Sequence, residues 1–451
     1  TPQLVFEQYR EQLPTFSRVM ERGVWGPLKS SDPPITVPAW ACMFSGRDPG
    51  ELGLYGFRNR ADHSYDNLVI ADSREVQFKR AWDYASEAGL DVVVLGVPQT
   101  FPPASVKGVL VASFLTPSKQ SNYTYPALVK WELDRLAGDD DTGYVIDIEN
   151  FRTDDKDELL RAISDMTRSR FRVARAWLDR RSWNLFCMVE MGPDRLHHGF
   201  WRFADPGHRL YEPGNPYEDA LIEYYRLLDA ELASLLERLP ADATLLVVSD
   251  HGARRMEGGI CINEWLIQEG LLTVRRRPEQ VERLSYDDVV WPQTRVWGEG
   301  GYYGRVFINV QGREPQGCVP ADDYERFRDE LADRIRGIPD HEGNPLGTVV
   351  HKPEALYRQV NRVAPDLLVY FGDLAWRSVG SLGHQAIHTF TNDTGPDDAN
   401  HDHHGIVLGQ GPGLDGIGEL RGTTLYDVLP TILTRLGLQV PDELVGEVIG
   451  A

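Results

Sequence analysis

The sequence predicts an α/β fold in which a mostly parallel central sheet is sandwiched by helices. Short apolar runs bounded by Gly, Pro or Asp are typical of buried strands, and longer stretches of helical period lie between several of them. The chain of 451 residues, 41% of them hydrophobic, is long enough to bury a large core. In such folds functional groups gather at the carboxyl ends of strands, so the residues that end each apolar run are candidates for a site.

Five runs are expected to form buried strands, because each is short and almost continuously apolar. They are residues 91–98, 184–192, 243–252, 366–373 and 405–411. Two longer stretches, 157–181 and 216–239, carry apolar residues at helical spacing, and we expect them to form helices against the sheet. Because strands and helices alternate, the sequence favours parallel pairing.

One segment, residues 256–350, interrupts this alternation. It carries its own helical stretch at 322–337, a strand candidate at 305–310 and several Gly and Pro residues, so we expect an inserted cap subdomain. After this insertion the chain is expected to return to the central sheet near residue 365.

The catalytic core is then expected in two parts, residues 1–255 and 351–451. Within the first part, residues 113–155 are rich in Thr, Tyr, Ser and Asp and form a second candidate cap insertion. Both insertions are expected over the rim of the sheet, where their side chains would contact a substrate.

Composition excludes several classes of function. The net charge of −21 would repel long nucleic acid, and no basic patch compensates for it. No stretch approaches the roughly 20 apolar residues of a membrane span. The four cysteines lie far apart without Cys-x-x-Cys spacing, which argues against a zinc knuckle or a disulfide framework and favours a reducing, cytoplasmic location. We expect a small-molecule substrate, and the sequence leaves the oligomeric state open.

Residues 32–46 read DPPITVPAWACMFSG and place Thr36 where the chain enters an apolar helix. Threonine caps helices and proline favours their first turn, so the hydroxyl could serve local structure alone. It could instead be a nucleophile, because a helix N-terminus attracts the anionic group that a hydroxyl would attack. The rest of the chain has to decide between these interpretations.

Two pairs of potential metal ligands follow predicted strands. Asp194 and His198 are four positions apart, a spacing that puts both side chains on one face of a helix. Asp250 and His251 end another run, and they can act together if the chain has left the strand by Asp250. Each pair also has an ordinary explanation, as a helix cap or as a turn.

A third group is the histidine cluster NHDHHG at residues 400–405, which holds His401, His403 and His404. Histidine-rich tracts favour metal binding. Together the three groups offer mixed Asp and His ligands, which suit zinc or manganese, and two metal ions about 4 Å apart would hold a phosphoryl group. In that setting Thr36 becomes a credible nucleophile.

These motifs resemble those of a known family. The chain is similar to the type I phosphodiesterase and nucleotide pyrophosphatase branch of the alkaline phosphatase superfamily in five segments: ITVPAWACMFSGRDPGELGLYGF, MGPDRLHHGFW, VVSDHG, HDHHGIVLGQGPG and LYDVLPTILTRLGLQVPDELVGE. Two further segments, FINVQGREPQG and SFLTPSKQSNYTYP, resemble a prokaryotic subgroup described as predicted phosphohydrolases or phosphomutases. The resemblance implies an alkaline-phosphatase-like fold and two divalent metal ions, normally zinc and sometimes manganese.

The resemblance also implies roles for particular residues. Thr36 would be the nucleophile, would bridge the metals and would carry a phosphothreonine intermediate. Asp250 and His251 would bind the metal that activates it. The second metal would be bound by Asp194, His198 and His401. His401 is chosen over its neighbours because the family places this histidine four residues before a Gly, here Gly405.

Other positions follow the family less closely. The family's first metal ligand is an Asp in an N-terminal strand, but no Asp precedes Asp32, so we expect that strand upstream of Thr1. Asn59 is near the position of an Asn that holds a phosphate oxygen in some relatives. Five residues of the insertions are candidates for stacking or phosphate contact, although aromatic residues there could equally form the small core of a cap: Tyr123, Tyr125, Tyr302, Tyr303 and Arg305.

We therefore expect a phosphohydrolase that cleaves phosphate esters, of the phosphodiester or nucleotide pyrophosphate type, through phosphorylated Thr36. A phosphomutase or a phosphomonoesterase of the same superfamily is the alternative, and an inactive homologue that serves as a scaffold is a further one. A sulfatase is disfavoured because the pattern that its modified Cys or Ser requires is absent around Thr36.

Overall fold

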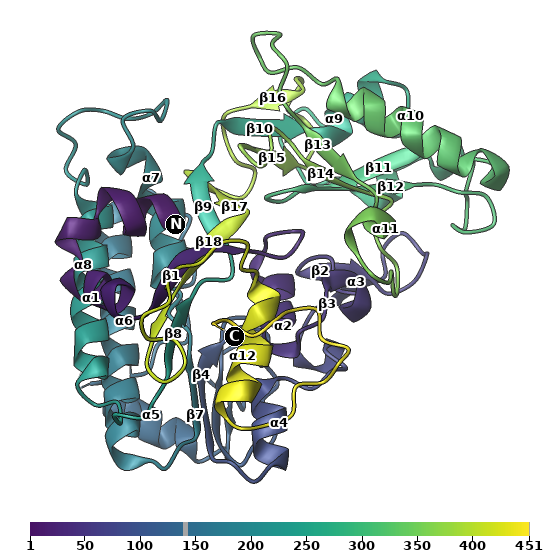
Figure 1. Ribbon diagram of the computed structural model, residues 1–451. Helices are drawn as coiled ribbons and strands as arrows, with labels where there is room; N and C mark the ends of the chain where they lie inside the picture. Colours follow the sequence, from purple (N-terminus) through teal and green to yellow (C-terminus); the bar gives the residue numbers. More distant parts are fainter. Residues whose placement is uncertain (139–142, 451) are drawn as a thin grey trace.

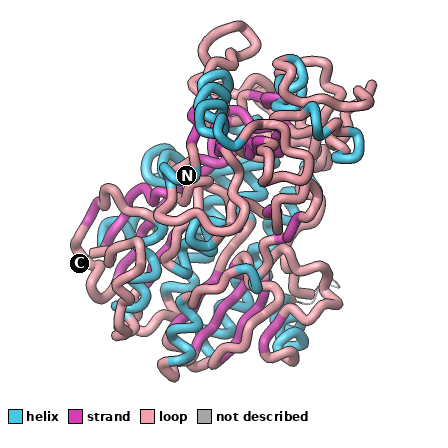
Figure 2. The backbone as a smooth tube through the Cα atoms, turned by 90° about the vertical axis from the view of Figure 1, so that its right-hand side faces the viewer, coloured by secondary structure: helices cyan, strands magenta, loops and turns pink. Residues whose placement is uncertain are grey.

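The computed structural model describes residues 1–138 and 143–450, and its α/β architecture confirms the predicted class (Figure 1). A larger lobe contains two four-stranded sheets, and a smaller lobe is built around a third. Figure 2 shows the strands of the larger lobe below those of the smaller one. The chain ends lie in the larger lobe.

The first sheet of the larger lobe has the strand order β19-β1-β18-β8. Its strands are Val24–Lys29 (β1), Leu245–Val248 (β8), His404–Gln410 (β18) and Gly418–Glu419 (β19). The long ladders, β1 with β18 and β18 with β8, are both antiparallel. The predicted parallel pairing therefore does not extend to these two ladders, because β18 follows the segment of the smaller lobe and runs opposite to both of these neighbours.

The second sheet has the order β6-β5-β4-β7 and is parallel except at β6. Its strands are Val92–Val97 (β4), Gly108–Ala112 (β5), Thr124–Tyr125 (β6) and Leu185–Met188 (β7). All of β4 is buried, as expected for a strand with helices on both faces. Val94 faces one apolar cluster and Val93 the other, which is the alternation that a strand imposes.

Helices cover both faces of these sheets (Figure 1). One face carries Pro14–Arg22 (α1), Val129–Ala137 (α5), Lys156–Arg180 (α6), Gly192–Ala204 (α7) and Ala220–Leu236 (α8). The other face carries Thr36–Ser45 (α2), Ala81–Glu87 (α4) and Val428–Arg435 (α12), with the short Pro49–Leu52 (α3) beyond α2. Helices α6 and α8 confirm the two helical stretches predicted from periodicity.

The smaller lobe is built on an antiparallel sheet of order β11-β12-β14-β13. Its strands are Val296–Glu299 (β11), Gly304–Ile308 (β12), Val349–His351 (β13) and Leu367–Tyr370 (β14). A smaller sheet beside it contains Gly258–Cys261 (β10), Trp376–Val379 (β15) and His388–Thr389 (β16). Its helices are Ile262–Gln268 (α9), Tyr324–Arg336 (α10) and Pro353–Leu356 (α11).

The run 366–373 was expected in the central sheet, and this expectation is wrong. It forms β14, which pairs with β12 and β13 of the smaller lobe. Both the central sheet and this one bury an apolar strand, so composition alone could not tell them apart. The boundary predicted near residue 350 therefore falls inside this sheet. The division into domains stays a prediction, and residues 139–142 of the candidate insertion 113–155 lie outside the described residues.

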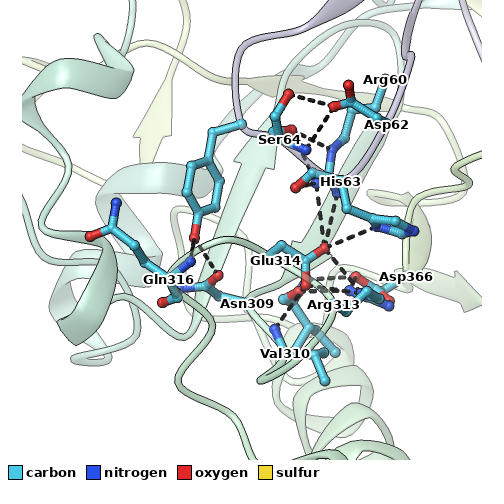
Figure 3. Close-up of polar contacts among 12 residues, drawn as sticks. Arg60, Asp62, His63, Ser64, Asn309, Val310, Arg313, Glu314, Gln316 and Asp366 are labelled. Carbon is cyan, nitrogen blue, oxygen red and sulfur yellow. Dashed lines mark hydrogen bonds and ion pairs between the residues drawn. The ribbon is translucent and has the colours of Figure 1, made fainter.

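The two lobes are joined by the antiparallel pair Gly252–Arg255 (β9) and Ala399–Asp402 (β17), and by a hairpin. This hairpin, Arg58–Arg60 (β2) with Leu68–Ile70 (β3), is fastened to the smaller lobe by buried charges (Figure 3). Arg60 lies 3.4 Å from Glu314, whose side chain is fully buried. Arg313 in turn lies 2.9 Å from Glu314.

Two features bear on the environment of the protein. All four cysteines are free thiols. Within residues 1–138 and 143–450, no helix is both long and apolar enough to cross a membrane. The predicted cytoplasmic location stays a prediction.

Candidate active site

The fold brings the ends of four elements together. Helix α7 begins at Gly192, so Asp194 and His198 lie in its first two turns with the predicted spacing of one helical face. Strand β8 ends at Val248 and β9 begins at Gly252, so Asp250 and His251 lie between the two strands. The chain has thus left the strand by Asp250, which was the condition for the two side chains to bind one metal ion together. His401 and Thr36 lie beside these four residues.

The first group consists of Asp194, His198 and His401. The Nε2 atoms of the two histidines are 3.3 Å apart. Asp194 Oδ1 lies 3.4 Å from Nε2 of His198 and 3.8 Å from Nε2 of His401. Three such atoms within 4.8 Å of one another are a plausible ligand set for one divalent ion. His401 lies on β17, which pairs with β9 and packs against α7, and this placement brings His401 to the other two residues.

The second group consists of Thr36, Asp250 and His251. Thr36 Oγ1 lies 3.3 Å from His251 Nε2, and the same nitrogen lies 3.3 Å from Asp250 Oδ2. Asp250 Oδ2 is buried and has no hydrogen-bond partner in the described part of the chain. A buried carboxylate oxygen without a partner is costly unless a cation occupies the space beside it, so this group fits a metal as well.

The two groups form one cluster. The rings of His251 and His401 stack with their centroids 3.7 Å apart. Their outer nitrogens are held by the backbone: Nδ1 of His251 donates to the carbonyl of Gly252, and Nδ1 of His401 donates to the carbonyl of Pro34, each over 2.9 Å. A proton on Nδ1 leaves the lone pair on Nε2, which is the atom that faces the cluster in both residues.

Charged side chains hold the other two ligands. His198 Nδ1 lies 2.7 Å from Asp397 Oδ1, so its Nε2 also faces the cluster. Arg195 Nη1 donates to Asp194 Oδ2 over 2.6 Å, which leaves Oδ1 toward the histidines. Asp194, His198, His251 and His401 therefore each present one atom inward, while a protein group binds the other polar atom of the side chain.

The electrostatics of the cluster are strongly perturbed. Burial raises the pKa of Asp250 to about 6. Burial also opposes the charged forms of Asp194 and His198, but their mutual attraction holds the pKa of Asp194 well below its usual range. Attraction to Asp397 and Asp194 raises the pKa of His198 to about 9. A metal ion bound to His198 would therefore displace a proton.

The structure also bears on the helix-cap interpretation of Thr36. The N-cap of α2 is Ile35, and no side chain makes a capping hydrogen bond there. Thr36 is the first helical residue instead of preceding the helix, and its hydroxyl points to His251. A capping role would require a hydrogen bond to the backbone of the first turn. Among the described residues, the hydroxyl makes no hydrogen bond within α2 that would give it a capping role.

Asn59 and Arg305 have partners elsewhere. Asn59 accepts from the backbone of Tyr55 over 2.8 Å and donates to the carbonyl of Gly56 over 3.0 Å. Arg305 pairs with Glu299 at 2.5 Å and also donates to a carbonyl of the β2 hairpin. Neither residue makes a described contact with the six clustered residues, so their substrate-binding role stays a prediction.

Three residues that bind the candidate ligands or their partners were not predicted from the sequence: Arg195, Arg152 and Asp397. The signal that could have found Asp397 is the acidic pair at 397–398, directly upstream of the histidine cluster. Tyr302, one of the stacking candidates, does stack, but on the candidate ligand His401 with a centroid distance of 4.2 Å. Tyr123, another candidate, is buried in an apolar cluster.

Comparisons with known proteins identify the family and the fold of this chain. The family model of type I phosphodiesterase / nucleotide pyrophosphatase matches residues 1–405. A search of curated proteins found no match. Among solved structures, human ectonucleotide pyrophosphatase / phosphodiesterase 5 aligns with a TM-score of 0.54 at 13% identity, over 95% of this chain and 91% of that chain.

The murine protein of the same name aligns with a TM-score of 0.53 at 15% identity, over 96% of this chain and 93% of that chain. An inactive threonine-to-alanine variant of it in complex with AMP aligns with the same TM-score and identity, over 95% of this chain and 91% of that chain. At such identities the structures establish a shared fold.

Proposed function

The chain belongs to the type I phosphodiesterase / nucleotide pyrophosphatase family and is a hydrolase of phosphoric esters, and from this premise we propose that it cleaves small phosphodiesters of the nucleotide type through Thr36 at a site for two divalent metal ions. One observation carries the proposal. The Nε2 atoms of His198, His251 and His401 face one cluster, in which His251 lies 3.3 Å from the Thr36 hydroxyl and stacks on His401, while the Nδ1 atom of each histidine is held by a protein partner.

The residues divide into two ligand sets. Asp194, His198 and His401 would hold one ion, and Asp250 and His251 with Thr36 would hold the other. Imidazole and carboxylate donors suit zinc first and manganese second. Bound ions of this kind supply Lewis acidity and make a hydroxyl easier to deprotonate.

Thr36 would then act in two steps. Its Oγ1 forms a bond to phosphorus while the bond from phosphorus to the leaving-group oxygen breaks, and the hydroxyl proton passes to solvent. The leaving-group oxygen takes up a proton from solvent and departs as an alcohol, and the phosphorylated Thr36 keeps the second ester group of the substrate. Water next attacks this phosphorus, the bond from Thr36 Oγ1 to phosphorus breaks, and the phosphate monoester and the free hydroxyl result. The N-terminus of α2, a helix of ten residues, favours the anionic phosphoryl group throughout.

Two further observations bear on the substrate. One neighbour of the same fold is described in complex with AMP, which favours a nucleotide-like ester here. The net charge of −21 argues against long nucleic acid as the substrate. Arg152 and Tyr302, which lie beside the cluster, offer a cation and an aromatic ring to a small anionic ligand.

The test combines metal analysis with two chromogenic esters, para-nitrophenyl phosphate and its bis-ester. We expect roughly two zinc or manganese ions per chain and faster cleavage of the bis-ester. Faster cleavage of the monoester would indicate a phosphomonoesterase, and transfer of the phosphoryl group to an added alcohol or sugar would indicate a mutase. Absence of both metal and turnover would overturn the proposal in favour of a binding protein.

A further inference from the structure

One carboxylate outside the ligand set has a special place in the structure. Asp397 Oδ1 accepts a hydrogen bond from His198 Nδ1 over 2.7 Å, and the Asp397 side chain is fully buried. The carbonyl oxygen of Ala399 lies farther from the same nitrogen, at 3.1 Å, so Asp397 makes the shorter and charged of the two contacts that hold the proton of His198 on Nδ1. Its Nε2 remains free to face Asp194 and His401, which a metal ligand requires.

The second oxygen of Asp397 is also occupied. Arg152 Nε donates to Oδ2 over 2.9 Å, and the Tyr302 hydroxyl donates to the same oxygen over 3.0 Å. All three neighbours donate hydrogen bonds to Asp397. A carboxylate fits this position because both of its oxygens accept, whereas a side chain with an N–H donor does not fit. His198, Arg152 and further cations hold the pKa of Asp397 below its usual range, although burial opposes this.

The donors come from distant parts of the chain. Arg152 belongs to the stretch 113–155, Tyr302 lies between β11 and β12 of the smaller lobe, and His198 belongs to α7. The Tyr302 ring also stacks on His198, with centroids 4.9 Å apart and planes at 18°. Both stretches that the sequence marked as insertions thus converge on the residue behind one candidate metal ligand.

We propose that Asp397 is a positioning residue that fixes the tautomer and ring orientation of His198 for metal binding, and that Arg152 and Tyr302 hold its carboxylate in place. This inference rests on the metal site of the proposed function. It assigns to the two insertions a part in building the metal site itself, in addition to any contact with substrate.

The chain offers a matched control in the next residue. Asp398 is also buried, but its side chain faces Arg202 at 3.7 Å, and only its backbone N–H contacts His198, through the carbonyl. Asp398→Asn therefore makes the same chemical change one position away without altering the His198 ring. Asp397→Asn keeps the size of the side chain but replaces one acceptor oxygen with an NH₂ group. In either orientation of the amide, this NH₂ faces a hydrogen-bond donor of the protein.

The experiment measures zinc affinity by competition with a chromogenic chelator on the full chain. We expect wild type to bind two ions, Asp397→Asn to bind one of them about 10-fold to 100-fold more weakly with the other unchanged, and Asp398→Asn to match wild type within about twofold. Equal zinc affinity for Asp397→Asn and wild type would overturn the inference while leaving the proposed function intact. No zinc bound by wild type would overturn the proposed function, and the inference with it.

A second variant covers the case in which Asp397→Asn does not fold. Tyr302→Phe removes one donor to Asp397 and keeps the ring that stacks on His198. We expect it to weaken the same ion several-fold without changing the thermal midpoint of the metal-free protein. A loss of thermal stability with unchanged zinc affinity would assign Tyr302 and Asp397 a purely structural role.

Discussion

Replacing Thr36 by valine tests whether its hydroxyl serves chemistry or structure. Valine has nearly the same shape as threonine, so the buried position stays filled and only the hydroxyl is lost. The helix itself gives little reason for a structural effect, because no side chain caps α2 and Thr36 already lies inside the helix. The variant therefore separates the two interpretations raised by the sequence.

The structure sets the expected loss of stability. The hydroxyl makes one described hydrogen-bond contact, at 3.3 Å to His251, and a bond of that kind contributes about 1 kcal/mol at most. A true capping residue would cost a similar or larger amount, up to about 2 kcal/mol. For metal-free protein we expect a free energy of unfolding within about 1 kcal/mol of wild type.

The expected loss of activity is far larger. If Thr36 Oγ1 forms the bond to phosphorus, valine leaves no nucleophile, and we expect the turnover of the bis-ester to fall at least about 10³-fold. Thr36→Ser keeps a hydroxyl on the same carbon and is the matched control, for which we expect measurable turnover to survive.

The assay is release of para-nitrophenol from the bis-ester, with urea unfolding of the metal-free protein followed in parallel. Rapid quenching of wild type during turnover should also reveal a phosphorylated chain that Thr36→Val lacks. Full activity in the valine variant, accompanied by a clear loss of stability, would refute the reasoning and return Thr36 to a structural role.

Three further predictions concern stability. Arg60→Met leaves buried Glu314 with one cation fewer, and we expect a loss of about 3 kcal/mol in urea unfolding; a change below about 1 kcal/mol would contradict it. Burial lowers the pKa of His208 from 6.5 to about 4, so as the pH falls the unfolded chain takes up this proton before the folded chain does. The stability of the folded protein should therefore fall between pH 6.5 and pH 4. In His208→Asn the fall in thermal midpoint over this range should be smaller, and an equal fall would contradict the prediction. Removing metal with a chelator should lower the thermal midpoint, because an ion present at about 1,000 times its Kd stabilises the folded protein by about 4 kcal/mol. An unchanged midpoint would argue against a bound ion.

The sequence predicted those features that depend on neighbouring positions along the chain. The spacing of Asp194 and His198 anticipated their shared face on α7, and the apolar runs anticipated strands β4, β7, β8 and β18. Periodicity reports which side of an element is apolar, because backbone geometry fixes where successive side chains point. The α/β class followed from this local information, and the family followed from the resemblance of short motifs to those of known proteins.

Only the tertiary structure decided which distant groups meet. It buried His401 within the cluster and left His403 partly exposed beside Asp373, although both lie in one histidine tract. It placed β14 in the smaller lobe, and it brought Asp397 behind His198. Such contacts depend on how strands from different parts of the chain pair and on how the two lobes pack together. A run of apolar or acidic residues does not specify which distant segment it will contact.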